Sequence, residues 1–95
     1  MLLQVLCFFR PLLDTCLSDA EEKKISEVME NYKEKIIDYH QLRTRKSGNI
    51  RYIEFHMTVR SELTVKESHE LTEMIENDIE AALKNTNMTI HIEPA

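Results

Sequence analysis

His91 and Glu93 stand two residues apart in a segment, residues 88–93, where apolar and polar residues alternate. If this segment is a strand, both side chains point to the same face, because successive side chains of a strand alternate between its two faces. Neutral imidazole and carboxylate are groups that bind zinc and similar divalent cations. The spacing therefore predicts two potential metal ligands on the polar face of a sheet.

A second alternating run, residues 52–59, places His56 on its polar face, and His40 falls in the segment just before it. Neighbouring strands lie about 5 Å apart, so side chains from three strands of one small sheet can converge. Glu93 adds a fourth ligand of a suitable type. The alternative is a solvated polar face on which the histidines have no ligand role.

Two helices are indicated by capping boxes, in which a hydroxyl residue is followed three positions later by glutamate. Ser18 begins the first, so the helix starts near Asp19 and continues with apolar residues at helical spacing. The periodicity extends to Ile37, although Ile36 and Ile37 could equally open a strand. Thr64 begins the second helix, which carries an apolar stripe, has His69 in its first turn and ends near residue 85.

Gly48 is the only glycine of the chain and lies where a tight turn needs a positive φ. The flanking segments, residues 36–45 and 50–60, are therefore predicted to form a β-hairpin. The last strand precedes Pro94, which cannot extend a ladder of hydrogen bonds.

The resulting order is α-β-β-α-β, an α+β fold. The second and third strands are joined by a helix and should therefore be parallel, with a right-handed crossover. We expect a three-stranded mixed sheet with both helices on one face and the other face open. This arrangement is a ferredoxin-like sandwich that lacks its first strand.

The length of 95 residues indicates one domain with a thin core. The net charge of -5 argues against a nucleic-acid-binding protein, which usually carries a basic patch. The sequence carries no nucleophile elbow, P-loop or zinc-protease motif, so we do not expect an enzyme.

The N-terminal segment, residues 1–13, is apolar but shorter than the roughly 20 residues of a membrane-spanning helix. It is either the end of a longer hydrophobic helix or a surface that binds a partner. Cys7 and Cys16 lie in or beside it and form no C-x-x-C motif, so we expect buried, unreactive thiols in a reducing compartment.

Residues 40–48 read H-Q-L-R-T-R-K-S-G and resemble the H-x-L-R-T-R-x-S-G signature of the cytoplasmic C-terminal domain of cation diffusion facilitator transporters. Three further segments follow in the family's order: a histidine-bearing strand at 52–57, a helix start at 63–69, and a closing I-H-x-[ED]-P at 90–94. Residues 12–22 resemble the family's linker from its last membrane helix. The resemblance covers about residues 12–94.

This resemblance implies that residues 1–17 are an apolar linker from a membrane part and that residues 18–95 form a cytoplasmic, metal-binding and dimerising domain with a metallochaperone-like fold. It implies a homodimer attached to a membrane-embedded transporter, and a first helix that ends near Tyr32 with Ile36 and Ile37 in the strand. The ligands that it implies are His40, His56, His69, His91 and Glu93.

Two residues depart from the family's pattern. Glu93 stands where the family often has aspartate, and Ser68 replaces the usual alanine before His69. Zn²⁺ suits the implied ligands best, while Fe²⁺, Mn²⁺, Co²⁺ and Ni²⁺ accept similar ones. The expected function is to sense cytosolic metal and tighten the dimer; the alternative is a purely structural dimerisation module.

Overall fold

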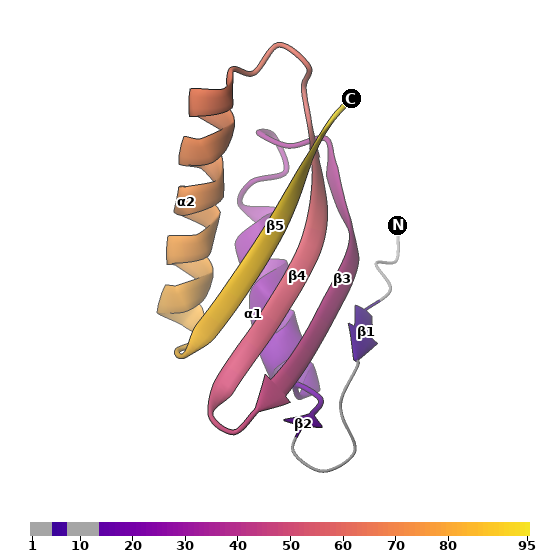
Figure 1. Cartoon of the computed structure of the whole chain (residues 1–95), viewed down its shortest axis with the longest axis vertical. Helices are drawn as coiled ribbons and strands as arrows, with labels where there is room; N and C mark the ends of the chain where they lie inside the picture. The colour runs from indigo at the N-terminus through magenta and orange to yellow at the C-terminus, as the bar shows by residue number, and fades with distance from the viewer. Residues whose placement is uncertain (1–4, 8–13) are drawn as a thin grey trace.

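Two helices pack on one side of a mixed sheet in the computed structural model, which describes residues 5–7 and 14–95 (Figure 1). This arrangement confirms the predicted α-β-β-α-β fold, with two short strands before it. The elements are β1 (Val5–Cys7), β2 (Asp14–Thr15), α1 (Asp19–Glu30), β3 (Asp38–Ser47), β4 (Ile50–Val59), α2 (Val65–Ala82) and β5 (Thr86–Pro94).

The capping box at Ser18 begins α1 as the sequence predicts. The backbone N–H of Glu21 donates to the Ser18 hydroxyl (3.2 Å), and the Glu21 carboxylate accepts from the Ser18 N–H (3.0 Å). The helix ends at Glu30, so the continuation of its periodicity to Ile37 is wrong, since the chain turns at residues 31–35. The strand assignment for Ile36 and Ile37 is also two residues early, because β3 begins at Asp38. The Ile37 N–H nevertheless donates to the carbonyl of Thr58 (2.8 Å).

The predicted hairpin is present, with β3 and β4 antiparallel and Ser47 paired with Ile50. Gly48 has a φ of 60°, which confirms the positive φ predicted for this turn. The two-residue loop fixes the register of the pair.

A β-bulge in β3 interrupts this register between His40 and Arg43. His40 pairs with His56 and Arg43 with Glu54, so two residues of β3 oppose one residue of β4, and Gln41 adopts a φ of 55°. The extra residue lets Tyr39 and Leu42, three positions apart, share the helix-covered side, where Leu42 is fully buried and Tyr39 packs against the core. His40 consequently remains on the open face of the sheet.

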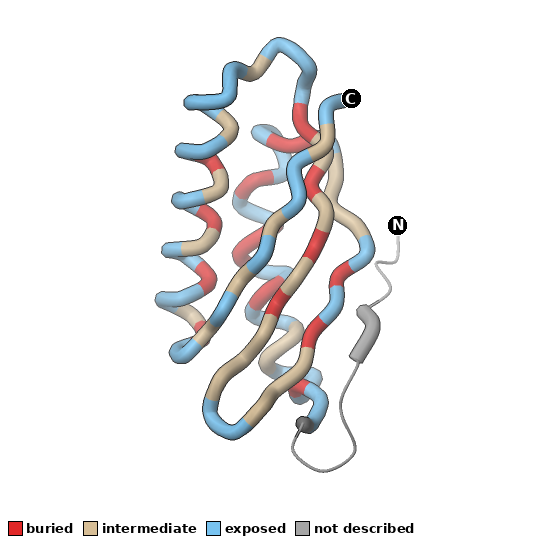
Figure 2. Tube along the Cα trace, in the orientation of Figure 1, coloured by how far each residue is buried: buried red, intermediate tan, exposed pale blue. Residues whose placement is uncertain are grey.

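The second capping box begins α2 at Val65, and β5 pairs with β4 in the predicted parallel orientation. Leu71, Ile75 and Ile79 form the buried stripe of α2. Along β4, buried residues alternate with half-buried ones (Figure 2), because one face meets both helices while the other has no helix over it. The accessible side chains of β4 therefore lie on the face opposite the helices.

Two short N-terminal strands extend the sheet beyond the prediction. β1 pairs with β3 in parallel and β2 pairs with it antiparallel. The helical alternative for the N-terminal segment is wrong at residues 5–7, while residues 1–4 and 8–13 lie outside the described part. None of the described helices has the length and apolar character that crossing a membrane requires.

Cys16 differs from its prediction as well. It lies between β2 and α1, where it is exposed, and it is disulfide-bonded. The prediction of a buried thiol is therefore wrong for Cys16, and the side chain of Cys7 lies outside the described residues.

Candidate metal centre

Three histidines form a row across the open face of the sheet, one on each of the three long strands. His40 on β3 pairs with His56 on β4, which pairs in turn with His91 on β5. The rings of His40 and His56 lie 5.5 Å apart between centroids, and those of His56 and His91 lie 4.7 Å apart, with interplanar angles of 24° and 22°. The antiparallel and parallel registers together bring residues far apart in the sequence into one row.

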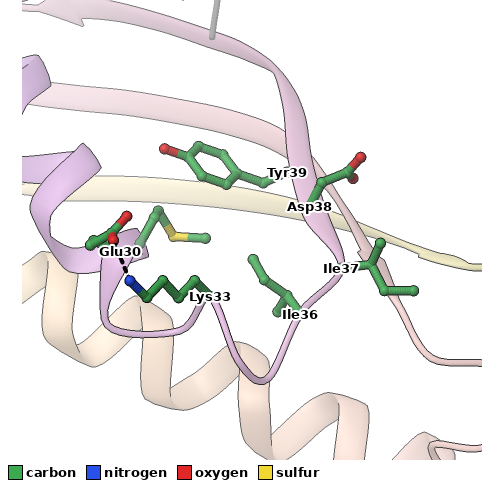
Figure 3. Close-up of a pocket in the computed structure, with 7 residues that line it drawn as sticks. Glu30, Lys33, Ile36, Ile37, Asp38 and Tyr39 are labelled. Carbon is green, nitrogen blue, oxygen red and sulfur yellow. Dashed lines mark hydrogen bonds and ion pairs between the residues drawn. The ribbon is translucent and has the colours of Figure 1, made fainter. Parts of the chain in front are cut away.

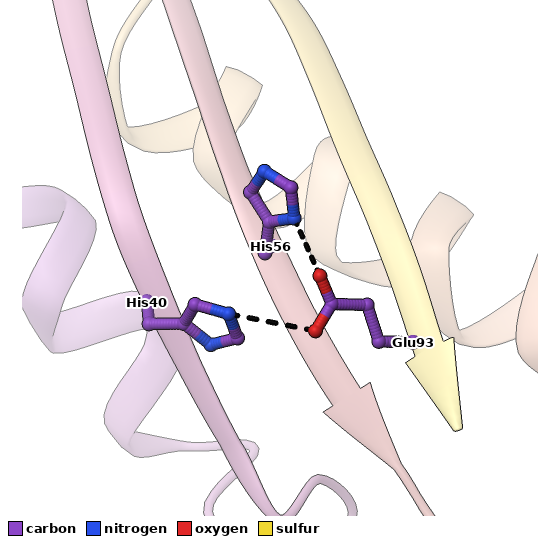
Figure 4. A group of neighbouring side chains, drawn as sticks. All are labelled: His40, His56 and Glu93. Atoms are coloured by element: carbon purple, nitrogen blue, oxygen red, sulfur yellow. Dashed lines mark hydrogen bonds and ion pairs between the residues drawn. The ribbon is translucent and has the colours of Figure 1, made fainter. Parts of the chain in front are cut away.

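Glu93 reaches back from β5 between the first two rings (Figure 4). Its Oε1 lies 2.7 Å from His56 Nδ1, and its Oε2 lies 3.5 Å from His40 Nε2. One ligand atom from each of these three side chains falls within 4.8 Å of the other two. His40, His56 and Glu93 therefore form a compact cluster with two nitrogen donors and one carboxylate.

The geometry of this cluster suits a small divalent cation. In a tetrahedral zinc site with bonds of about 2.0–2.1 Å, neighbouring ligand atoms lie about 3.3 Å apart. The contacts of 2.7 Å and 3.5 Å involve different oxygens of Glu93, and one ligand atom from each side chain lies within 4.8 Å of the other two, so the three groups are near enough to converge on one cation. The three side chains are between 30% and 44% exposed, which leaves room for a further ligand.

His91 lies beside the cluster rather than within it. Its ring stacks on His56, while its Nε2 lies 3.0 Å from Oε2 of Glu54. The hydrogen bond with His91 is the main reason that the pKa of Glu54 lies below its ordinary value; the nearby Arg43 adds to this effect and burial opposes it. Glu54 is therefore an anion in contact with the outer imidazole of the row.

His69 is not brought to the other predicted ligands within one chain. It lies on α2, where its side chain is 70% exposed and its Nε2 is 2.9 Å from Oε1 of Glu73. It lines a hollow together with Ile90 and Ile92 of β5. A role for His69 at the cluster would therefore require a second copy of the chain.

Two carboxylates near the cluster, Asp38 and Glu54, are not among the predicted ligands. Asp38 Oδ1 lies 3.4 Å from His40 Nδ1, and Glu54 contacts His91 as described above. Both could have been found from the spacing that identified His91 and Glu93, because Asp38 and Glu54 each stand two residues before a histidine on the same strand.

A hollow of about 250 Å³ lies where α1 gives way to β3 (Figure 3). Its charged rim includes Glu30 and Lys33, whose carboxylate and ammonium lie 2.9 Å apart. Because these two charges are already paired, the hollow offers a weaker case for ligand binding than the histidine cluster does.

Comparison with known proteins identifies the family of the chain. The model of the cytoplasmic domain of cation efflux proteins matches residues 17–95. The chain is 34% identical over 83 residues to the cation-efflux pump FieF of Pectobacterium atrosepticum; the match covers 87% of this chain but only 27% of that relative. The chain therefore spans about a quarter of the length of this curated relative.

Two solved structures share the fold. The zinc form of the transporter CzrB is 31% identical, with a TM-score of 0.74 over 83% of this chain and 90% of that one. The metal-bound C-terminal domain of the CzcD transporter from Thermotoga maritima is 27% identical, with a TM-score of 0.72 over 82% and 94%. The resemblance carried by the four sequence segments is thereby confirmed: the chain belongs to the family of cytoplasmic domains of cation efflux proteins.

Proposed function

We propose that this domain binds a divalent cation, with Zn²⁺ preferred, and that binding regulates the cation efflux transporter to which the domain belongs. The observation that carries the proposal is the convergence of His40, His56 and Glu93 from three strands. The similarity to a zinc form of CzrB supports the choice of metal. Iron, manganese, cobalt and nickel remain alternatives, because imidazole and carboxylate also accept them.

A cation must compete with a proton for the ring nitrogens of the cluster. The 2.7 Å contact between His56 Nδ1 and Glu93 Oε1 requires a proton between the two atoms in the metal-free protein. In a neutral His56 this is the single ring proton, so Nδ1 can bind a cation only after the proton moves to Nε2, and a proton is released to the solvent only where the ring is protonated before binding. Affinity should accordingly fall as the pH drops to about 6.5 and below, where ordinary imidazoles become protonated.

The domain should also form a homodimer that the cation tightens. Each copy carries a net charge of -5, so metal-free copies repel each other modestly and in a salt-dependent manner. The proposed additional ligands are His91, whose ring stacks on His56, and the partner subunit's His69, since His69 is not brought to the cluster within one chain. Moving a two-state dimer from mostly open to mostly closed needs about 5 kcal/mol of differential affinity, which a zinc site of three or four ligands can supply.

The longer protein is proposed to be a membrane transporter that exports divalent cations. Support comes from the family and from the relative FieF, a cation-efflux pump of which this chain matches about a quarter. In that reading the domain reports cytosolic metal to a membrane part outside this chain.

Calorimetric titration of the purified chain with Zn²⁺ tests the binding proposal. The wild type should bind zinc, and the double variant His56→Ala, His91→Ala should lose most of the binding. A double variant of exposed residues elsewhere on β5, Asn87→Ala and Thr89→Ala, is the matched control and should bind as the wild type does. Absence of binding heat in the wild type, or unchanged binding in the histidine variant, would remove the proposal.

Sedimentation with and without zinc separates the sensor from the structural module. A sensor should dimerise more tightly with zinc, and a chelator should lower its melting temperature, because a ligand of the folded state raises stability. The variant His69→Ala should then weaken the zinc-dependent dimer more than it weakens zinc binding. A dimer whose affinity and melting temperature ignore both zinc and chelator supports the structural module instead.

A further inference from the structure

Two carboxylates flank the row of imidazoles, one at each end. Asp38 Oδ1 lies 3.4 Å from Nδ1 of His40, and Glu54 Oε2 lies 3.0 Å from Nε2 of His91. The two carboxylates thus address different ring nitrogens of the two outer histidines. A neutral imidazole has one N–H donor and one lone pair, so a carboxylate beside one nitrogen favours the tautomer that carries its proton there.

His40 lies between two carboxylates at nearly equal distances, Asp38 at Nδ1 and Glu93 at Nε2. Glu93 is already paired with His56, whereas Asp38 Oδ1 has no hydrogen-bond partner among the described residues, so the proton is favoured on Nδ1 and Nε2 keeps the lone pair. That atom faces Glu93 Oε2 at 3.5 Å, which is the side of the ring on which the cluster forms. Asp38 Oδ1 is buried and makes no hydrogen bond of good geometry within the described part of the chain. A buried carboxylate oxygen strongly favours a donor, and the N–H at His40 Nδ1 becomes one after a small rotation of the ring.

For His91, the same argument gives the opposite tautomer. Its Nε2–H donates to Glu54, and Nδ1 keeps the lone pair. The other oxygen of Glu54, Oε1, lies 3.6 Å from Nη1 of Arg43, so the guanidinium of this β3 residue helps to hold the carboxylate in place. Arg43, Glu54 and His91 therefore form a chain of contacts across the three strands.

We propose that Asp38 and Glu54 are positioning residues that fix His40 and His91 in opposite tautomers and so preset which nitrogen of each ring is available to a cation. The inference rests on the proposed metal-binding function and assigns a role to two residues outside the predicted ligand set. Outer carboxylates of this kind typically change metal affinity by about 10- to 100-fold, because they orient a ligand ring and raise its basicity.

Nitrogen-15 NMR of the metal-free, histidine-labelled chain tests the tautomers directly. At about pH 8, where ordinary imidazoles are neutral, His40 should carry its proton on Nδ1 and His91 on Nε2. Single His→Gln variants assign the signals. In Asp38→Ala and Glu54→Ala, the corresponding ring should shift toward a mixture of tautomers. The reverse tautomers in the wild type, or tautomers that both alanine variants leave unchanged, would overturn the inference.

Zinc affinity supplies the second readout. Asp38→Ala and Glu54→Ala should each weaken binding by about 10- to 100-fold, while Asp38→Asn and Glu54→Gln, whose amide oxygens still accept a hydrogen bond, should lose less. Glu27→Gln removes an exposed carboxylate of α1 and is the charge-matched control.

The outcomes separate the two proposals. If the wild type binds zinc and all four carboxylate variants behave like Glu27→Gln, the positioning role is wrong and the proposed function stands. If the wild type binds no zinc, the function fails and the positioning role fails with it. If the alanine variants nevertheless change the tautomers of His40 and His91 as expected, the hydrogen bonding is as described and only the assignment of a metal site is wrong.

Discussion

The guanidinium of Arg51 on β4 contacts the carboxylate of Glu21 in the first turn of α1, with Nε 2.5 Å from Oε2. The same guanidinium donates from Nη1 to the carbonyl of Lys84, just before β5. The side chains of Arg51 and Glu21 are only 20% and 18% exposed. One ion pair therefore joins the hairpin, the first helix and the start of the last strand at one end of the molecule.

This contact predicts a loss of stability in acid. The backbone N–H of Ser18, followed by Arg51, lowers the pKa of Glu21 from 4.5 to about 2. Because the folded-state pKa is depressed, the stabilisation is fully present above about pH 4.5 and is lost as the pH falls toward about 2. The shift corresponds to at most about 3 kcal/mol, so Glu21→Gln should lower the unfolding free energy at pH 7 by about 1–3 kcal/mol. Urea unfolding at several pH values should show a flatter acid dependence for this variant, whereas Glu27→Gln should keep the wild-type profile. Identical profiles for Glu21→Gln and the wild type would contradict the prediction.

Thr44 offers a stabilising substitution. Its side chain is fully buried, and its hydroxyl has no hydrogen-bond partner in the described part of the chain. Valine has nearly the same shape and no polar atom, so Thr44→Val should raise the unfolding free energy by about 1 kcal/mol, since it removes an unsatisfied hydroxyl. Thr89→Val, at an exposed site on β5, is the control and should change stability by less than about 0.5 kcal/mol. Destabilisation by Thr44→Val would indicate that the hydroxyl does find a partner.

The positive φ of Gln41 in the bulge predicts that glycine is more stable than valine at this position, the reverse of the usual order in a strand. With a φ of 55°, Gln41 occupies a conformation that glycine adopts freely and β-branched residues resist. Gln41→Gly should therefore be neutral or stabilising by up to about 1 kcal/mol, and Gln41→Val should destabilise by about 1–2 kcal/mol. At Thr89, a position without positive φ, the order should reverse, with glycine the worse of the two residues. Chemical unfolding of the four variants checks this, and the same order at both sites would argue against a constrained bulge.

Glu93 should contribute to metal affinity through its charge and its length. Glu93→Gln removes the only carboxylate of the three-residue cluster and should weaken zinc binding by about 100-fold, or roughly 3 kcal/mol. Glu93→Asp keeps the charge but shortens the side chain by one methylene, so this variant should lose less zinc affinity than Glu93→Gln does. Competition with a chromophoric chelator measures both, and the exposed Glu27→Gln again serves as the control. Equal affinities for Glu93→Gln and the wild type would exclude Glu93 as a ligand.

Most of the fold could be predicted because its signals are local. Ser18 and Thr64 cap their helices with glutamates three residues later, and Gly48 marks the hairpin turn. The bulge could not be read in the same way, since the extra residue at Gln41 shifts the alternation by one position and weakens the strand pattern. The short strands β1 and β2 have too few residues to show any alternation.

The candidate site depends on strand register. The hairpin loop sets that register locally for β3 and β4, but the bulge at Gln41 and the pairing of β4 with β5 are not encoded by neighbouring residues. Alternation places His40, His56 and His91 on one face, but only strand pairing puts them in one row. The distinction between His91, which turns to Glu54, and the clustered Glu93 arises from side-chain contacts that no spacing rule reveals. His69 shows the opposite limit, because its helix lies on the other side of the sheet and a single chain cannot bring it to the cluster (Figure 1).

The strand order places His56 on an inner strand and Glu93 on an outer strand of the described sheet, so their backbones differ in protection by hydrogen bonds. Among the described residues, β4 has hydrogen-bonded neighbours along both sides, whereas β5 has one on a single side. Local opening begins where backbone hydrogen bonds are most exposed, so amide exchange should be fastest on β5 and slowest on β4. Glu93 would then swing away while His56 stays fixed, and fraying of one outer strand would set how quickly a bound ion escapes.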